Sequence, residues 1–220
     1  ESQEPAVGVE EFLRRYNEKE RDFTGINLAG VDLVGKSLAS GDLNLSQANL
    51  SRAKLKKANL PCVNFSGAIL RGAELCEAEL NNINLSEANL NNADLSKAKL
   101  YQAKLGQANL KNANLSEANL QRADLREANL SGANLSGADL SQQTNLSGVN
   151  LSGANLNRAN LRKAQLIKAN LRNADLSNAN LLETNLEGTN LQGAKLEKAL
   201  CNATTIFPAS FDSVKAGVYF

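Results

Sequence analysis

An apolar residue recurs at every fifth position through most of the chain, and this spacing limits the possible folds more than any other feature. From Leu45 to Leu140 there are 20 such centres, and 19 of them are Leu. Ala usually lies two positions before each centre, with Asn or Asp often between them. Five residues advance an α-helix by about 140° net, so these leucines would form no helical stripe. On a continuous strand, an odd spacing would send successive leucines to opposite faces.

Within one five-residue unit, Ala and Leu are two positions apart, so both lie on the same side of a short extended segment. The next two residues must then turn the chain, so that the following Ala and Leu also face inward. Turn-forming pairs such as Ser66-Gly67 and Ser131-Gly132 occupy these two positions, and glycine permits positive φ there. The spacing therefore predicts a coil of short segments and corners with a Leu and Ala interior.

The tandem unit Ala-(Asn/Asp)-Leu-x-x resembles the pentapeptide-repeat proteins, and the resemblance covers nearly all of residues 23–211. It implies an all-β solenoid, a right-handed quadrilateral β-helix with four units per coil and a short N-terminal capping helix. Counting 38 units gives about nine and a half coils. At about 4.8 Å per coil, the rod would be roughly 45 Å long.

Both ends of the chain depart from the repeat. Residues 1–22 are predicted to form a tail and a capping helix, because Val9, Phe12, Leu13 and Tyr16 follow helical spacing; a partner-binding helix is the alternative. Residues 212–220 are predicted to form a C-terminal cap, although this apolar tail could instead be a dimerisation surface. We therefore expect a monomer or an end-to-end homodimer. The segment Phe12-Leu13-Arg14-Arg15-Tyr16, which leads into Arg21-Asp22-Phe23, and the segment 205–212 also resemble those of cyanobacterial members of the family, including its regulator of heterocyst differentiation.

The phase of the repeat slips twice, near 39–44 by two residues and near 141–145 by one residue. If four units make a coil, both slips fall on the same corner of the rod, about 24 Å apart. They mark either a docking edge or two tolerated bulges. Tyr101 is the one aromatic residue expected to be exposed in the middle of the rod, and Tyr is favoured at interfaces. The predicted partner contacts are Tyr101, Ser141, Gln142, Gln143, Thr144 and Leu182.

The residue inventory argues against catalysis. The chain has no His, which removes the commonest general base and metal ligand. Its three Cys have no zinc-type spacing: Cys201 is predicted to face inward, and Cys62 and Cys76 to lie on outward corners. We expect no catalytic residue, cofactor, metal or small-molecule substrate. Free thiols indicate a reducing compartment, the cytoplasm, with a processed periplasmic or thylakoid-lumen form as the alternative.

The apolar runs are far shorter than the roughly 20 residues that span a bilayer, and no signal peptide is apparent. We therefore expect no membrane association. The first residue is Glu and not Met. Either proteolytic processing or trimming of the sequence would account for this start.

The charge pattern separates the remaining functions. Some pentapeptide-repeat proteins of the quinolone-resistance type act on DNA gyrase as negatively charged DNA mimics. Here residues 1–22 carry a net charge of −3 and the remainder +4, which is the wrong sign for a phosphate mimic. One side carries Arg52, Arg71, Lys111 and Arg172, too sparse and without the aromatic residues that nucleic-acid binding uses.

We therefore predict a non-enzymatic, rigid protein–protein interaction or regulatory scaffold with a protein partner of unknown identity. The alternatives are a DNA-mimicking modulator of DNA gyrase and a passive structural rod. Nucleic acid is not an expected partner.

Overall fold

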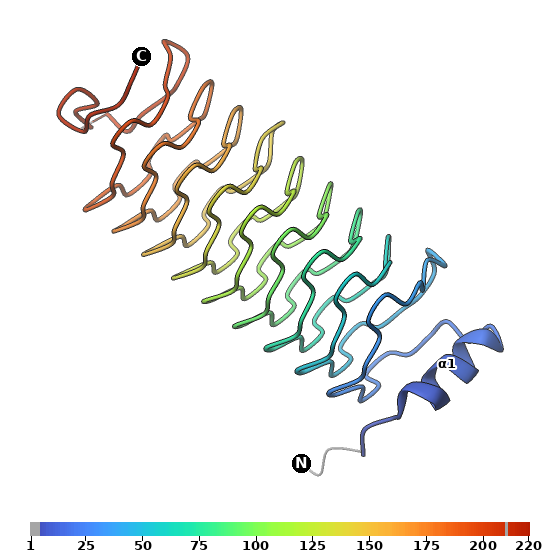
Figure 1. The fold of residues 1–220 in the computed structure, drawn as a ribbon. Coiled ribbons are helices and arrows are strands. Elements are labelled where there is room, and N and C mark those ends of the chain that lie inside the picture. The colour runs from blue at the N-terminus through green and yellow to red at the C-terminus, as the bar shows by residue number, and fades with distance from the viewer. Residues whose placement is uncertain (1–4, 210) are drawn as a thin grey trace.

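The computed structural model describes residues 5–209 and 211–220, which form one helix followed by a long stack of coils (Figure 1). Parallel bridges join each coil to the next, so that Asn64 pairs with Asn84 and Asn84 with Lys104. The partner lies 20 residues along the chain in the regular part of the stack, which makes each coil four five-residue units. The four-unit coil that the family resemblance implies is thus observed.

The extended segments are shorter than strands. Two residues of each unit form a turn, which leaves three for the extended part, and only the middle one forms a bridge. The described residues accordingly contain isolated bridges and no longer strand. We number the four sides of the coil by their bridge residues and assign to each side the corner that follows it. The first side contains Asn44 and Asn64, the second Asn49 and Ile69, the third Lys54 and Glu74, and the fourth Asn59 and Glu79.

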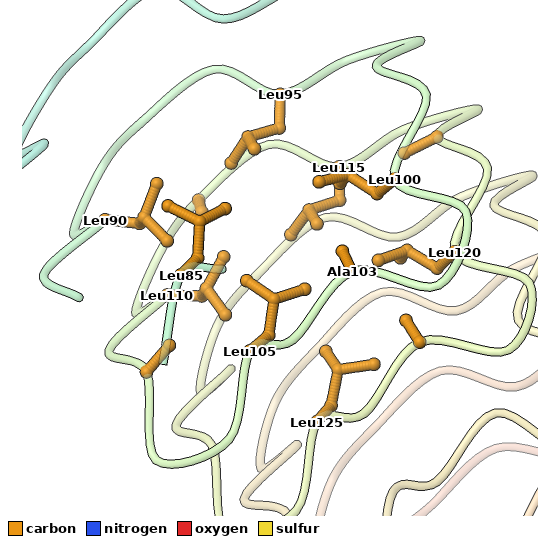
Figure 2. Packing of buried hydrophobic residues seen from close by; sticks show 14 of the residues in the cluster. Leu85, Leu90, Leu95, Leu100, Ala103, Leu105, Leu110, Leu115, Leu120 and Leu125 are labelled. Carbon is orange, nitrogen blue, oxygen red and sulfur yellow. The ribbon is translucent and has the colours of Figure 1, made fainter. Parts of the chain in front are cut away.

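Leu and Ala side chains fill the interior of the coil. Leu105, Leu110, Leu115 and Leu120 come from the four sides of one coil, and each is 0% exposed. Figure 2 shows these leucines and those of the neighbouring coil pointing into a common interior, with Ala103 beside them. One coil cannot bury its leucines alone, so each coil depends on its neighbours for a closed core.

Each corner is a β-turn that begins at the inward Leu. The carbonyl of Leu110 accepts a hydrogen bond from the amide of Ala113 at 3.0 Å, and Asn112 between them has a φ of 57°. Positive φ at the third residue is typical of type II turns and is costly for residues other than Gly. The amide of Asn112 is nevertheless held in place, because it donates to the carbonyl of Ser131 in the next coil at 3.0 Å.

The recurrent Asn supports the corners and joins the coils. The side-chain oxygen of Asn64 accepts the amide of Ser66 at 3.1 Å, as in an Asx-turn. Its side-chain nitrogen donates to the oxygen of Asn44 in the preceding coil at 3.0 Å, and Asn84 donates to Asn64 in the same way at 3.1 Å. An outward Asn therefore fills two structural roles, which explains why the unit favours it.

The helix α1, Val9–Asn17, covers the first coil. Phe12 is fully buried against Phe23, with their ring centroids 4.9 Å apart in an edge-to-face arrangement. Just before the helix, the amide of Val7 donates to the carbonyl of Asn27 at 2.7 Å. The helix thus lies where the apolar spacing predicts it and shields the end of the core from water.

The bridges place the phase slips on one corner. Asp22 pairs with Asn44, which is an insertion of two residues, and Asp124 pairs with Asn145, which is an insertion of one. Both insertions follow the fourth side, in agreement with the sequence analysis. A third insertion was not predicted.

The third insertion changes the register of the last unit. Asn185 pairs with Ile206, 21 residues away, so one residue is inserted at the same corner. Ile206 therefore lies on the outer surface and is 48% exposed, while Phe207 packs against the core. A repeat that runs on to residue 211 predicts that Ile206 faces inward, and this prediction is wrong because Phe207 takes the inward place; Phe211 does pack against the core.

After Phe207 the chain leaves the repeat and returns at its end. The rings of Phe207 and Phe211 stack with centroids 4.9 Å apart. Tyr219 then bridges Leu200 on the fourth side, and the amide of Cys201 donates to the carbonyl of Tyr219 at 2.7 Å. The C-terminal segment therefore covers part of the last coil.

Replacing Leu110 with Asp tests the inward register. An unpaired carboxylate in this interior is expected to cost several kcal/mol and to unfold the middle of the rod. Asn109→Asp is the matched control, because it adds the same charge at the adjacent outward position and keeps the oxygen that caps the amide of Lys111. Thermal and urea unfolding measure both variants; equal stability of the two would contradict the register.

Thiol labelling tests how tightly the C-terminal segment closes the last coil. Cys201 is 3% exposed, and burial raises the pKa of its thiol to about 11. The thiol therefore stays neutral through pH 8, and its reactive thiolate appears only as the pH approaches that raised value. Mass spectrometry after alkylation at pH 8 should find exposed Cys62 labelled in the native protein and Cys201 labelled only after unfolding. Equal labelling rates would mean that the end of the coil is open.

Candidate protein-interaction corner

All three insertions lie on the corner that follows the fourth side, at 39–42, 141–144 and 202–205. Between them the same corner is made by regular two-residue turns. We call this edge the fourth corner, and it comprises residues 39–42, 61–62, 81–82, 101–102, 121–122, 141–144, 162–163, 182–183 and 202–205. The other three corners keep the regular two-residue turn along the repeat.

The predicted contact residues all fall on the fourth corner. The amide of Asn82 donates to the carbonyl of Tyr101 at 2.9 Å, and the amide of Lys163 donates to that of Leu182 at 3.0 Å. Gln142 lies between them along the rod, and its backbone amide donates to the carbonyl of Arg162 at 3.2 Å. Tyr101 and Gln142 are two coils apart, as are Gln142 and Leu182, which corresponds to about 10 Å in each case. The structure thus aligns these residues in one column and does not gather them into a single cluster.

Tyr101 is half-buried on this corner. The guanidinium of Arg122, one coil further on, lies 5.9 Å from the centroid of its ring, within the range of a cation–π contact. The backbone amide of Tyr101 donates to the side-chain oxygen of Asn81 at 3.2 Å. The ring is therefore steadied by its neighbours while part of it remains accessible to a partner.

The structure corrects two of the predicted contacts. Ser141 is 6% exposed and Thr144 is 0% exposed, so neither side chain can reach a partner. The extra residue in this turn moves Thr144 into the inward position that Ala holds in regular units. Its hydroxyl is 2.9 Å from the carbonyl of Leu120 in the preceding coil and 2.9 Å from that of Ser141. Gln142 and Gln143 form the exposed tip of the insertion.

The third insertion repeats this arrangement. Thr205 takes the inward position, and its hydroxyl donates to the carbonyl of Leu181 in the preceding coil at 2.8 Å. A Thr that stands where the unit has Ala, five positions after the previous bridge residue instead of four, is the sequence signal shared by both insertions. The fivefold spacing alone does not reveal the insertion at 202–205, because that spacing contains no such signal.

The charged side chains between Gln142 and Leu182 form ion pairs with one another. A shallow hollow beside Gln142 is lined by Gln121, Arg162 and Lys163. Glu183, next to Leu182, pairs with Arg162 at 2.8 Å and with Lys163 at 3.5 Å. The hydrogen bond from Arg162, assisted by the charge of Lys163, lowers the pKa of Glu183 below its usual value. This carboxylate therefore remains ionised and keeps its two partners in place.

Within the described residues, no group of three or more His, Cys, Asp or Glu side chains is arranged to hold a metal ion. The hollows on the surface are open and shallow, unlike the enclosed pockets that bury small ligands.

In the part of the chain that the structure describes, α1 is far too short to cross a bilayer.

Comparison with protein families identifies the repeat. The model described as pentapeptide repeats matches in eight copies, over residues 42–72, 68–107, 103–142, 144–181 and 169–200. The matched region begins at the end of the first insertion, is interrupted at the second and stops before the third. The ends and the gap of the matched region therefore lie at the irregular turns of the fourth corner. A search of curated proteins gave no match.

Several solved structures are similar to this chain. HetL, a pentapeptide repeat protein involved in heterocyst differentiation regulation from Nostoc sp. strain PCC 7120, is 36% identical, with a TM-score of 0.48; the alignment covers 86% of this chain and 92% of HetL. A second pentapeptide repeat protein from Nostoc is 42% identical over 55% of this chain and 82% of its own, with a TM-score of 0.33. QnrB1, a plasmid-mediated fluoroquinolone resistance protein, is 21% identical over 78% of this chain and 93% of its own, with a TM-score of 0.38.

Replacing Thr144 with Val tests the role of the inward hydroxyl in the insertion. Val keeps the shape of the side chain but removes the hydrogen bond inside a buried turn, so we expect a loss of about 1 kcal/mol in the free energy of unfolding. Gln143→Gly at the exposed tip is the control, because Gly readily adopts the φ of 70° found there. Urea unfolding compares the two variants; no loss on Thr144→Val would contradict the structural role given to the hydroxyl.

Proposed function

The chain belongs to the pentapeptide-repeat family, and we propose that it is a non-enzymatic, rigid scaffold for protein–protein interaction or regulation. Its partner would bind along the fourth corner. One observation carries the proposal: the three insertions lie on this one edge together with Tyr101 and Leu182. A regular rod offers few distinguishing features, so a partner must recognise the departures from regularity.

The chemistry of the fourth corner supports a protein partner. Tyr101 offers a partly accessible ring, and aromatic side chains of this kind often dominate binding energy at protein interfaces. Gln142 and Gln143 offer amide groups at an exposed tip, and Leu182 adds a half-buried apolar contact. The stacked coils hold these groups at fixed distances along about 20 Å, which favours recognition of an extended or rigid surface.

We infer further that the coil is a right-handed quadrilateral β-helix, as the family resemblance implies. The bridges support a four-sided coil with parallel pairing. Connections between parallel segments of one sheet are right-handed in about 98% of cases, because a right-handed twist closes back on the sheet in that sense.

The charges argue against DNA mimicry. The chain has 24 Lys and Arg against 23 Asp and Glu, and several acids are neutralised by neighbouring cations, as in Lys99–Glu79 and Arg126–Asp124. A mimic of duplex DNA needs a dense row of unpaired negative charges. We therefore propose that the partner is a protein other than DNA gyrase.

Tyr101→Ala tests the proposal. We expect unchanged thermal stability, because the ring is half-buried on the surface, and at least about tenfold weaker binding to a partner captured from native lysate and then purified. Ser96→Ala is the matched control on the third corner of the same coil and should leave the affinity unchanged. Isothermal calorimetry with the purified partner measures all three proteins. Equal affinities would remove Tyr101 from the interface.

A supercoiling assay with purified DNA gyrase separates the alternatives. We expect no inhibition and no protection against quinolones at any concentration of the protein. Dose-dependent inhibition would support DNA mimicry in place of the scaffold. Absence of both a gyrase effect and a reproducible partner would leave a passive structural rod.

A further inference from the structure

The second side of the rod carries only one sign of charge. We define it by residues 27–30, 49–52, 69–72, 89–92, 109–112, 129–132, 150–153, 170–173 and 190–193. Its charged residues are Arg52, Arg71, Lys111 and Arg172, and none of its positions is Asp or Glu. Each of the other three sides carries both acids and bases along its length. The second side is therefore a strip with cations and without acids, in a chain whose net charge is only +1.

These four cations are also left without partners inside the protein. Several cations on the other sides pair with acids of the same or a neighbouring coil, as Lys99 does with Glu79 at 2.6 Å. In the described part of the chain, Arg52, Arg71, Lys111 and Arg172 are exposed and take part in no ion pair. Their charges are thus available to a ligand without first breaking an internal contact.

Two of the cations border a hollow. Arg52 and Arg71 lie on consecutive coils, where the amide of Arg52 donates to the carbonyl of Arg71 at 2.9 Å. Together with Ile69 and Asn89 they line an open hollow of about 770 Å³. Small residues, including Gly30 and Gly72, occupy corner positions in its lining.

The lining indicates the chemistry of the ligand. Two neighbouring guanidinium groups provide forked donors that match carboxylates. Ile69 is 39% exposed between them and offers an apolar contact that a purely ionic ligand would not use. The outward Asn side chains can donate to main-chain carbonyls. This combination suits a segment of protein that contains Asp or Glu beside an aliphatic residue.

Nucleic acid fits this side less well. Arg52 and Arg172 are six coils apart, so four cations are spread along about 29 Å. Duplex DNA carries one negative charge per roughly 1.7 Å of its axis, and single strands are usually bound by stacking on aromatic residues. The second side has no aromatic residue among its positions.

We propose that the second side is a docking surface for an acidic segment of a partner protein, anchored at Arg52 and Arg71. This surface is distinct from the fourth corner, because the second and fourth sides lie opposite each other in a four-sided coil. The proposal therefore goes beyond the scaffold contact proposed above and does not depend on it.

Fluorescence anisotropy with a labelled oligoglutamate peptide at low salt tests the proposal. We expect wild-type protein to bind, and Arg52→Gln with Arg71→Gln to weaken binding at least about tenfold. Lys56→Gln with Lys57→Gln is the matched control, because it removes the same charge from the third side of the coil that carries Arg52, where both lysines pair with Glu77. This control should bind within about twofold of wild type. Circular dichroism checks that both variants fold.

Each other result counts against the proposal. Equal weakening by both double substitutions would indicate a response to net charge alone, and failure of the wild type to bind the peptide would remove the surface. Tighter binding of single-stranded or duplex DNA of matched length, lost on Arg52→Gln with Arg71→Gln, would replace the acidic segment with nucleic acid. Tyr101→Ala should bind the peptide as wild type does, so failure here is distinguishable from failure at the fourth corner.

Discussion

The β-turn at each corner is the interaction on which the rest of the structure depends. In one corner the carbonyl of Leu110 accepts the amide of Ala113, and the chain leaves the turn with its next small and large apolar residues again facing inward. Because the same turn recurs, successive coils have the same cross-section and their backbones lie at bonding distance. The amide of Asn109 then reaches the preceding coil at Ala88, and the amide of Leu110 reaches the next at Asn129, at 2.9 and 2.7 Å.

Much of this arrangement could be predicted from the sequence, because the fivefold spacing has few physical solutions. It gives the inward Leu and Ala, the turn at each corner and the two phase slips, while helical spacing gives the helix that contains Phe12. The spacing alone does not give the four-unit coil, which came from the family resemblance. The burial of Cys201 also follows from the spacing, because it stands where Leu is expected.

The remaining features of the structure depend on hydrogen bonds of individual side chains, which the spacing of the repeat does not reveal. An inserted residue can face either the interior or the outer surface of the coil. Thr144 faces the interior, because its hydroxyl donates to the carbonyl of Leu120. The same choice at Thr205 moved Ile206 outward and Phe207 inward. Within the fourth corner, the alignment of Tyr101 with Leu182 follows from the 20-residue length of the regular coil. The contact of Arg122 with the Tyr101 ring depends on side-chain positions, which the spacing of the repeat does not give.

The four-sided coil also determines which changes in chain length the protein can absorb. Adding or removing 20 residues within the repeat lengthens or shortens the rod by one coil and leaves every later residue on its original side. Adding five residues would rotate everything beyond them by a quarter turn. Residues that now belong to the second side would then lie on the third side. Gene duplication in units of one whole coil therefore preserves both the positive strip and the irregular edge, while shorter duplications would scramble them without disturbing the leucine interior.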